Sequence, residues 1–161
     1  MNRHILVAVG PSFSEEALSA AIAKAQETGA RLTVLHVIDV SPWWSGTYAE
    51  GLCDTQALVH QLALVIRRQS EKMLRGAGIE FDWQMRSSPR DGRTIGRVIA
   101  QTANTLGADL IVLGTRRRGL LAIGMHPVRN GVCRYSACEV LIASPRVRPL
   151  ARVIAMPAAM A

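Results

Sequence analysis

The chain has 161 residues, of which 49% are hydrophobic and 19% are charged, and its formal net charge is +7. This length and composition suit one compact domain with its own core and exclude a disordered chain. No apolar run approaches the roughly 20 residues that a membrane-spanning helix needs, so we expect no membrane partner.

The first part of the chain alternates strand and helix patterns. Residues 4–9 are a continuous apolar run, typical of a strand buried on both faces. After a turn at residues 10–12, Ser12 and Glu15 have capping-box spacing, and apolar residues recur at helical spacing up to Gly29. Residues 32–38 predict a second buried strand. The two strands are therefore expected to be parallel, with a right-handed crossover between them.

The start of the chain and its cysteines bear on the compartment. The N-terminus is basic and then apolar, but it runs into the predicted helix without a cleavage site, so we expect a strand rather than a signal peptide and a cytoplasmic protein. Cys53, Cys133 and Cys138 lack metal-ligand spacing. We expect them to be small buried hydrophobic residues in a reducing compartment.

A long irregular segment, Asp39–Asp54, separates the second strand from the next helix, and it carries Trp43, Trp44 and Tyr48. Aromatic side chains on such a segment pack onto their own domain, cover a cleft, or anchor a partner protein. The sequence leaves these alternatives open.

The second part continues the alternation. A helix that ends near Gly76 and Gly78 is predicted to place five apolar residues on one face: Leu58, Leu62, Val65, Ile66 and Met73. Residues 79–86 alternate apolar and polar, typical of an edge strand. A third helix is expected from Asp91–Gly92 to Leu106, then a buried strand at 109–114, a short helix from about Pro127, and a last strand at 139–143.

These elements predict an α/β fold. The fold class is a doubly wound five-stranded parallel sheet, in strand order 3-2-1-4-5, with helices on both faces. Residues 1–144 would form the domain and residues 145–161 a C-terminal tail. Ligands of such sheets bind at the carboxyl ends of the strands, which here means residues 10–12 and 114–119.

Several segments in this order resemble one family. Residues 5–9 with Ser12, residues 32–37, residues 107–115, and residues 131–142 are similar to the corresponding strands and helices of universal stress proteins. The resemblance implies a non-enzymatic stress-response protein. It also implies a homodimer that pairs through the last strand, at Val140, Leu141, Ile142 and Ala143.

The same resemblance identifies a nucleotide motif that is largely lost. Nucleotide-binding members carry Gly, two residues, Gly, nine residues, then Gly and Ser or Thr. Here the first glycine is Gly114, while Arg116 or Arg117 stands in place of the second, and the closing pair falls on His126-Pro127. Proline has no amide hydrogen to donate to a phosphate.

The end of the first strand departs from the family as well. The usual Asp-Gly-Ser is Gly10-Pro11-Ser12 here, so the carboxylate near the nucleoside is missing. We therefore expect no ATP binding. If a nucleotide still binds, the resemblance places it against Gly10, Ser12, Val37, Gly114, Thr115, Arg116, Arg117, Gly119, His126, Pro127 and Val128.

Two alternatives remain open. Arg116–Arg118 and His126 could hold the phosphates of ATP or AMP through side chains. The basic C-terminal half could instead attract nucleic acid non-specifically, although no nucleic-acid motif is present. The histidines are scattered and no nucleophile–base–acid set is visible, so neither a metal site nor catalysis is expected, and His36 is predicted to be a hydrogen-bonded core residue.

Overall fold

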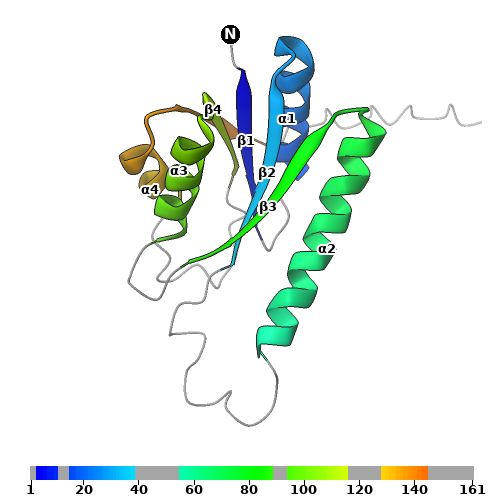
Figure 1. The fold of residues 1–161 in the computed structure, drawn as a ribbon, viewed down its shortest axis with the longest axis vertical. Helices are drawn as coiled ribbons and strands as arrows, with labels where there is room; N and C mark the ends of the chain where they lie inside the picture. Colours follow the sequence, from blue (N-terminus) through cyan, green and yellow to red (C-terminus); the bar gives the residue numbers. More distant parts are fainter. Residues whose placement is uncertain (1–2, 11–14, 39–54, 89–93, 116–127, 145–161) are drawn as a thin grey trace, which may run out of the picture.

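The structure is a computed structural model, and it describes residues 3–10, 15–38, 55–88, 94–115 and 128–144. Its five parallel strands have the order β3-β2-β1-β4-β5, which confirms the predicted fold class. The strands are β1 (His4–Val9), β2 (Arg31–Ile38), β3 (Phe81–Ser87), β4 (Leu110–Gly114) and β5 (Glu139–Ala143). The helices are α1 (Glu15–Thr28), α2 (Thr55–Gly76), α3 (Ile95–Leu106) and α4 (Val128–Tyr135) (Figure 1).

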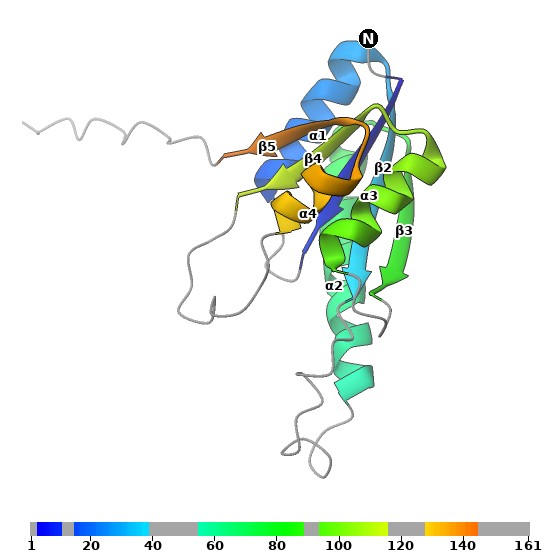
Figure 2. The same ribbon diagram turned by 90° about the vertical axis from the view of Figure 1, so that its left-hand side faces the viewer.

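The sheet separates two hydrophobic cores, because successive side chains of a strand point to opposite faces. Ile5 and Val7 of β1 belong to the core under α1 and α2. Leu6 of β1 and Ile111 of β4 belong to the core under α3 and α4. The two helical layers therefore lie on opposite faces of the sheet (Figure 2).

The buried face of α2 differs from the predicted one. Leu58, Leu62 and Val65 are 63%, 40% and 48% exposed, and the buried residues of the helix are Ala63, Ile66, Ser70 and Leu74. Leu62 and Val65 lie on a different side of the helix from their buried neighbours Ala63 and Ile66. The first turn, with Leu58, extends past the carboxyl ends of β2 and β3 (Figure 1). The prediction was right for Ile66 and Met73, which pack in or against the core, and wrong for the other three.

The start of α3 also differs. The helix begins at Ile95, with Thr94 as N-cap accepting a hydrogen bond from the Arg97 amide at 3.4 Å, rather than at Asp91–Gly92. Threonine is a favoured N-cap because its hydroxyl satisfies an amide that has no partner in the first turn. The end of the helix is as expected, since Gly107 adopts a left-handed conformation with φ of 62°.

Two glycines set the distance between α3 and α4. A Cβ atom added to Gly96 would lie 2.5 Å from the Val128 carbonyl oxygen and 2.9 Å from the Gly131 Cα. Only glycine allows the backbones of the two helices to approach this closely. The position of α4, including its first turn, therefore depends on Gly96.

Asp109 joins the amino ends of β1 and β4. Its Oδ2 accepts hydrogen bonds from the backbone amides of Arg3 at 2.8 Å and His4 at 3.0 Å. These two bonds lower the pKa of Asp109 below its ordinary value, and the bond from the Arg3 amide has the larger effect. A carboxylate whose pKa falls on folding stabilises the protein above its unfolded-state pKa, and this contribution is lost as the pH falls through the folded-state pKa.

We therefore expect Asp109→Asn to be less stable than the wild type at pH 7. The difference should begin to shrink as the pH falls below about 4, the ordinary range of an aspartate, and should be lost as the pH falls through the lower folded-state pKa, where the wild-type carboxyl becomes neutral too. Urea denaturation of both proteins between pH 7 and pH 2.5 measures this. A stability difference that stays constant over the whole range would contradict the role assigned to the charge.

Candidate nucleotide site at the carboxyl edge of the sheet

The candidate site lies where β1 and β4 end side by side. The chain proceeds from β1 to β2 on one side and reaches β4 on the other, so the crevice between β1 and β4 is the switch point of the sheet. Ala8 is paired in register with Leu113, which places Gly10 and Thr115 two residues further along neighbouring strands. The fold thus brings the two turns that the sequence singled out to the same edge.

The structure describes five of the predicted nucleotide-site residues. Gly10 and Gly114 are partly exposed, and Thr115 and Val128 are exposed. Val37 is buried, with 7% of its surface exposed. The other six lie outside the described residues: Ser12, Arg116, Arg117, Gly119, His126 and Pro127. The aromatic residues Trp43, Trp44 and Tyr48 also lie outside them.

The end of β1 offers a ligand no side chain. A Cβ atom added to Gly10 would meet no atom of the described residues within 4 Å. The carbonyl oxygen of the preceding Val9 is 2.9 Å from Nδ1 of His36, whose ring is buried. This bond confirms His36 as a hydrogen-bonded core residue, and it fixes the end of β1 against β2.

The end of β4 is engaged with β5. The backbone amide of Thr115 donates a hydrogen bond to the carbonyl oxygen of Ala143 at 3.0 Å. A phosphate cradle needs backbone amides that point at the anion. The Thr115 amide is directed to β5 instead, so it does not contribute to such a cradle.

The first turn of α4 is the remaining described part of the site. α4 begins at Val128, whose carbonyl oxygen packs against Gly96 near the start of α3. The N-terminus of a helix carries partial positive charge from its aligned peptide dipoles.

Across the part of the chain that the structure describes, no group of three or more His, Cys, Asp or Glu side chains could hold a metal ion.

β5, the strand expected at a dimer interface, pairs with β4 and is an edge strand among the described strands. Leu141 is 38% exposed, Val140 and Ile142 are partly buried, and Ala143 is buried. Figure 2 shows β5 at the border of the sheet, beside β4. Leu141 is therefore an exposed apolar side chain on a strand whose outer backbone groups pair with no other described strand.

One expectation about the cysteines was wrong. Cys133 is exposed on α4, because the buried residue of that short helix is Val132. Cys138 is partly buried, and its sulfur lies 3.1 Å from the Ser136 hydroxyl oxygen. Cys53 lies outside the described residues.

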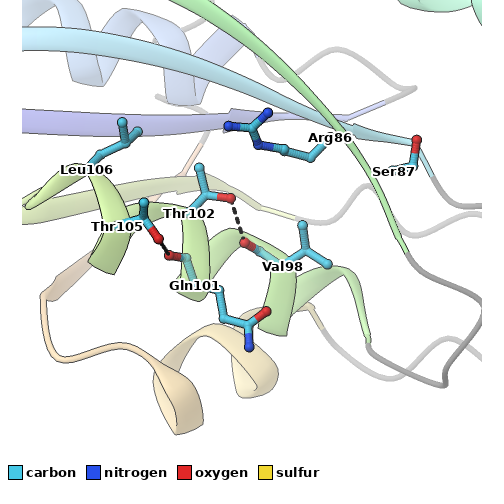
Figure 3. Close-up of a pocket in the computed structure, with 7 residues that line it drawn as sticks. All are labelled: Arg86, Ser87, Val98, Gln101, Thr102, Thr105 and Leu106. Atoms are coloured by element: carbon cyan, nitrogen blue, oxygen red, sulfur yellow. Dashed lines mark hydrogen bonds between the residues drawn. The ribbon is translucent and has the colours of Figure 1, made fainter.

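A second concavity, which the sequence did not single out, lies between β3 and α3. This pocket of about 230 Å³ is lined by Arg86, Ser87, Val98, Gln101, Thr102, Thr105 and Leu106 (Figure 3). The only available signal was the polar side of the alternating strand at 79–86, combined with polar residues at helical spacing in α3. The pocket lies beside β3, two strands from β1, and its Arg86 is paired in register with Val37 of β2.

Comparisons with known proteins agree with the fold. Residues 1–144 match the sequence profile described as the universal stress protein family. A protein of that family from Burkholderia pseudomallei has a similar structure, with a TM-score of 0.61 and 24% identity over 86% of this chain and 93% of that chain. The universal stress protein UspA from Lactobacillus plantarum gives a TM-score of 0.64 and 20% identity over 88% and 97%.

A third similar structure contains a ligand. The universal stress protein from Archaeoglobus fulgidus in complex with dAMP gives a TM-score of 0.61 and 19% identity, over 88% of this chain and 97% of that chain.

No significant match was found among curated protein sequences. None of the helices in the described ranges is long and apolar enough to span a bilayer.

Proposed function

Because the chain belongs to the universal stress protein family, we propose that it is a non-enzymatic stress-response protein that acts as a homodimer and does not bind ATP. Residues 1–144 would form the stress-protein domain, and residues 145–161 a tail beyond it. In this proposal the protein acts in the cytoplasm through contacts between its surfaces and other molecules.

Two features at the ends of β1 and β4 support the proposed absence of ATP binding. Gly10 has no side chain where nucleotide-binding relatives carry a carboxylate, and the Thr115 amide donates to Ala143. A nucleotide at this edge would thus lack one partner for its nucleoside and one for its phosphates. Each lost hydrogen bond to a charged group costs about 1.5–3 kcal/mol, and losing several reduces affinity by orders of magnitude.

The exposed edge of β5 supports the homodimer. An edge strand with an exposed apolar side chain favours pairing with another strand, because its outer amides and carbonyls need hydrogen-bond partners. A twofold axis beside β5 would pair the strand with its own copy and cover Leu141 in both subunits. We propose Val140, Leu141, Ile142 and Ala143 as the centre of this interface.

A second candidate function is a nucleotide-binding protein with an altered phosphate site. Two observations favour it: a structurally similar protein binds dAMP, and the switch point between β1 and β4 is retained here. In this alternative a nucleoside would lie near Gly10 and Val37. Arg116, Arg117 and His126 would bind the phosphates of ATP or AMP.

Thermal unfolding separates the two candidates. A nucleotide that binds with a dissociation constant of about 10 μM would, at about 1 mM, stabilise the protein by about 2.7 kcal/mol. For a chain of this length this raises the midpoint of unfolding by roughly 5–10 °C. We expect a change below about 1 °C with Mg-ATP or AMP, because the free energy of binding is too small. A large rise that disappears in the Arg116→Gln/Arg117→Gln variant would establish the second candidate.

A further inference from the structure

The layer formed by α3 and α4 is free of acidic residues. Between Asp91 and Glu139 the chain contains a single carboxylate, that of Asp109. This carboxylate is bound to the amides of Arg3 and His4 at the amino ends of the strands. The same stretch carries seven arginines: Arg93, Arg97, Arg116, Arg117, Arg118, Arg129 and Arg134.

The described arginines of this layer have no ion-pair partner among the described residues, in contrast to the opposite layer. On α1 and α2, Lys24 pairs with Glu27, and Glu71 pairs with both Arg67 and Arg75. By contrast, no described carboxylate lies within ion-pair distance of Arg97, Arg129 or Arg134. Uncompensated guanidinium groups on one face produce a positive potential there, which an external anion would neutralise.

Two of these guanidinium groups gather around one exposed ring. The Arg97 guanidinium lies 5.2 Å from the ring centroid of Tyr135, and that of Arg134 lies 5.7 Å from it. Tyr135 itself is 41% exposed at the end of α4. Stacking on a ring holds a guanidinium in place and leaves its N–H groups available for bidentate contacts with phosphate.

The pocket beside α3 extends this surface to the edge of the sheet. Arg86 reaches from β3 towards α3, and Gln101 of α3 points outward from the pocket (Figure 3). The Arg86 guanidinium donates a hydrogen bond to the neutral Gln84 amide oxygen at 3.2 Å, and no described carboxylate pairs with it. The one described carboxylate of β3, Asp82, is paired with Arg31.

We propose that this surface, which we call the arginine face (Arg86, Arg97, Arg129, Arg134 and Tyr135), binds single-stranded nucleic acid. The guanidinium groups would contact successive phosphates through their N–H groups, and the two guanidinium planes held over Tyr135 would offer their outer faces to unpaired bases. A duplex keeps its base faces stacked inside and cannot use these planes. The arginine face includes none of the nucleotide-site or dimer residues, so this inference stands apart from the proposed function.

The inference is tested with a fluorescent 20-nucleotide poly(U) and the full chain, by anisotropy at several salt concentrations. Four phosphate contacts predict that the logarithm of the binding constant falls with the logarithm of salt concentration with a slope of about −3. The Arg97→Gln/Arg134→Gln variant should reduce the magnitude of that slope by about 1.4 and weaken binding on the order of 10-fold at low salt. Arg97→Lys/Arg134→Lys should keep the slope, because the charges remain.

A matched control separates a local site from general attraction. Arg68→Gln/Lys72→Gln removes the same charge from exposed positions of α2 in the opposite layer, and it should change binding less than about 2-fold. Equal weakening by both double variants would overturn the inference, since net charge alone would then explain binding. Absence of poly(U) binding at low salt would overturn the inference too. Binding to anionic lipid vesicles is measured in parallel, and if the Arg97→Gln/Arg134→Gln variant lost vesicle binding as strongly as poly(U) binding, the inference would also be overturned.

Discussion

Gly96→Ala is expected to lower the free energy of unfolding by about 2–3 kcal/mol, the range of overpacked cores, although alanine is the better helix former. The new Cβ would lie 2.5 Å from the Val128 carbonyl oxygen and 2.9 Å from the Gly131 Cα, so backbone atoms of α4 would have to move. That movement separates α4 from α3 and exposes the core around Val132. In chemical denaturation the variant should therefore unfold at clearly lower denaturant concentration.

Two other glycine substitutions serve as controls. A Cβ atom added to Gly131 would lie 3.2 Å from its nearest atoms, so Gly131→Ala should lose less stability than Gly96→Ala. Gly10→Ala meets no atom of the described residues within 4 Å and should stay within about 0.5 kcal/mol of the wild type. All proteins are compared at one concentration, because dimerisation adds to apparent stability. If Gly96→Ala and Gly10→Ala were equally stable, the account of the α3–α4 contact would be wrong.

Leu141→Asp is expected to convert a homodimer into a monomer. In the proposed interface the side chain is covered by the second subunit, and an unpaired carboxylate buried there costs about 3–5 kcal/mol. This cost raises the dissociation constant on the order of 100-fold or more. Light scattering coupled to size-exclusion chromatography, at micromolar protein, measures the change directly.

Leu62→Asp is the matched control for this substitution. Leu62 is 40% exposed and Leu141 is 38% exposed, so both variants place a carboxylate at a similarly accessible leucine. Leu62 lies on α2 and Leu141 on β5, and only the β5 substitution should change the mass. If Leu62→Asp were a monomer while Leu141→Asp remained a dimer, the interface would lie on α2 and not on β5.

The sequence predicted the sheet well because each strand carries a strong local signal. The runs at 4–9 and 139–143 correspond to β1 and β5 with the same bounds, and the alternating segment at 79–86 became the edge strand β3. Buried runs and alternation arise from the surroundings of a strand in the sheet, so they appear in the sequence itself.

The face of α2 could not be predicted in the same way. Leu58, Leu62 and Val65 form an apolar stripe as regular as the buried one through Ala63 and Ile66. Which stripe is covered depends on how the helix is rotated about its axis against the sheet, and periodicity does not contain that information. The close approach at Gly96 is equally a tertiary fact, because the backbone that it contacts lies on another helix.

The candidate site was predictable in place but not in its hydrogen bonding. Strand order put Gly10 and Thr115 at one edge, as the alternation of elements indicated. The use of the Thr115 amide by Ala143 depends on the register between β4 and β5, which no spacing in the sequence fixes. The exposure of Cys133 likewise follows from how α4 is seated on the sheet.

Sedimentation of the wild-type protein with a dye-labelled ATP analogue, in magnesium buffer at physiological salt, tests both parts of the proposed function at once. The dye is followed at a wavelength where the protein does not absorb. We predict a species of twice the chain mass of 17.5 kDa, with no dye sedimenting in its boundary. Dye that moves with the protein at micromolar concentration, or a species of 17.5 kDa, would contradict the account.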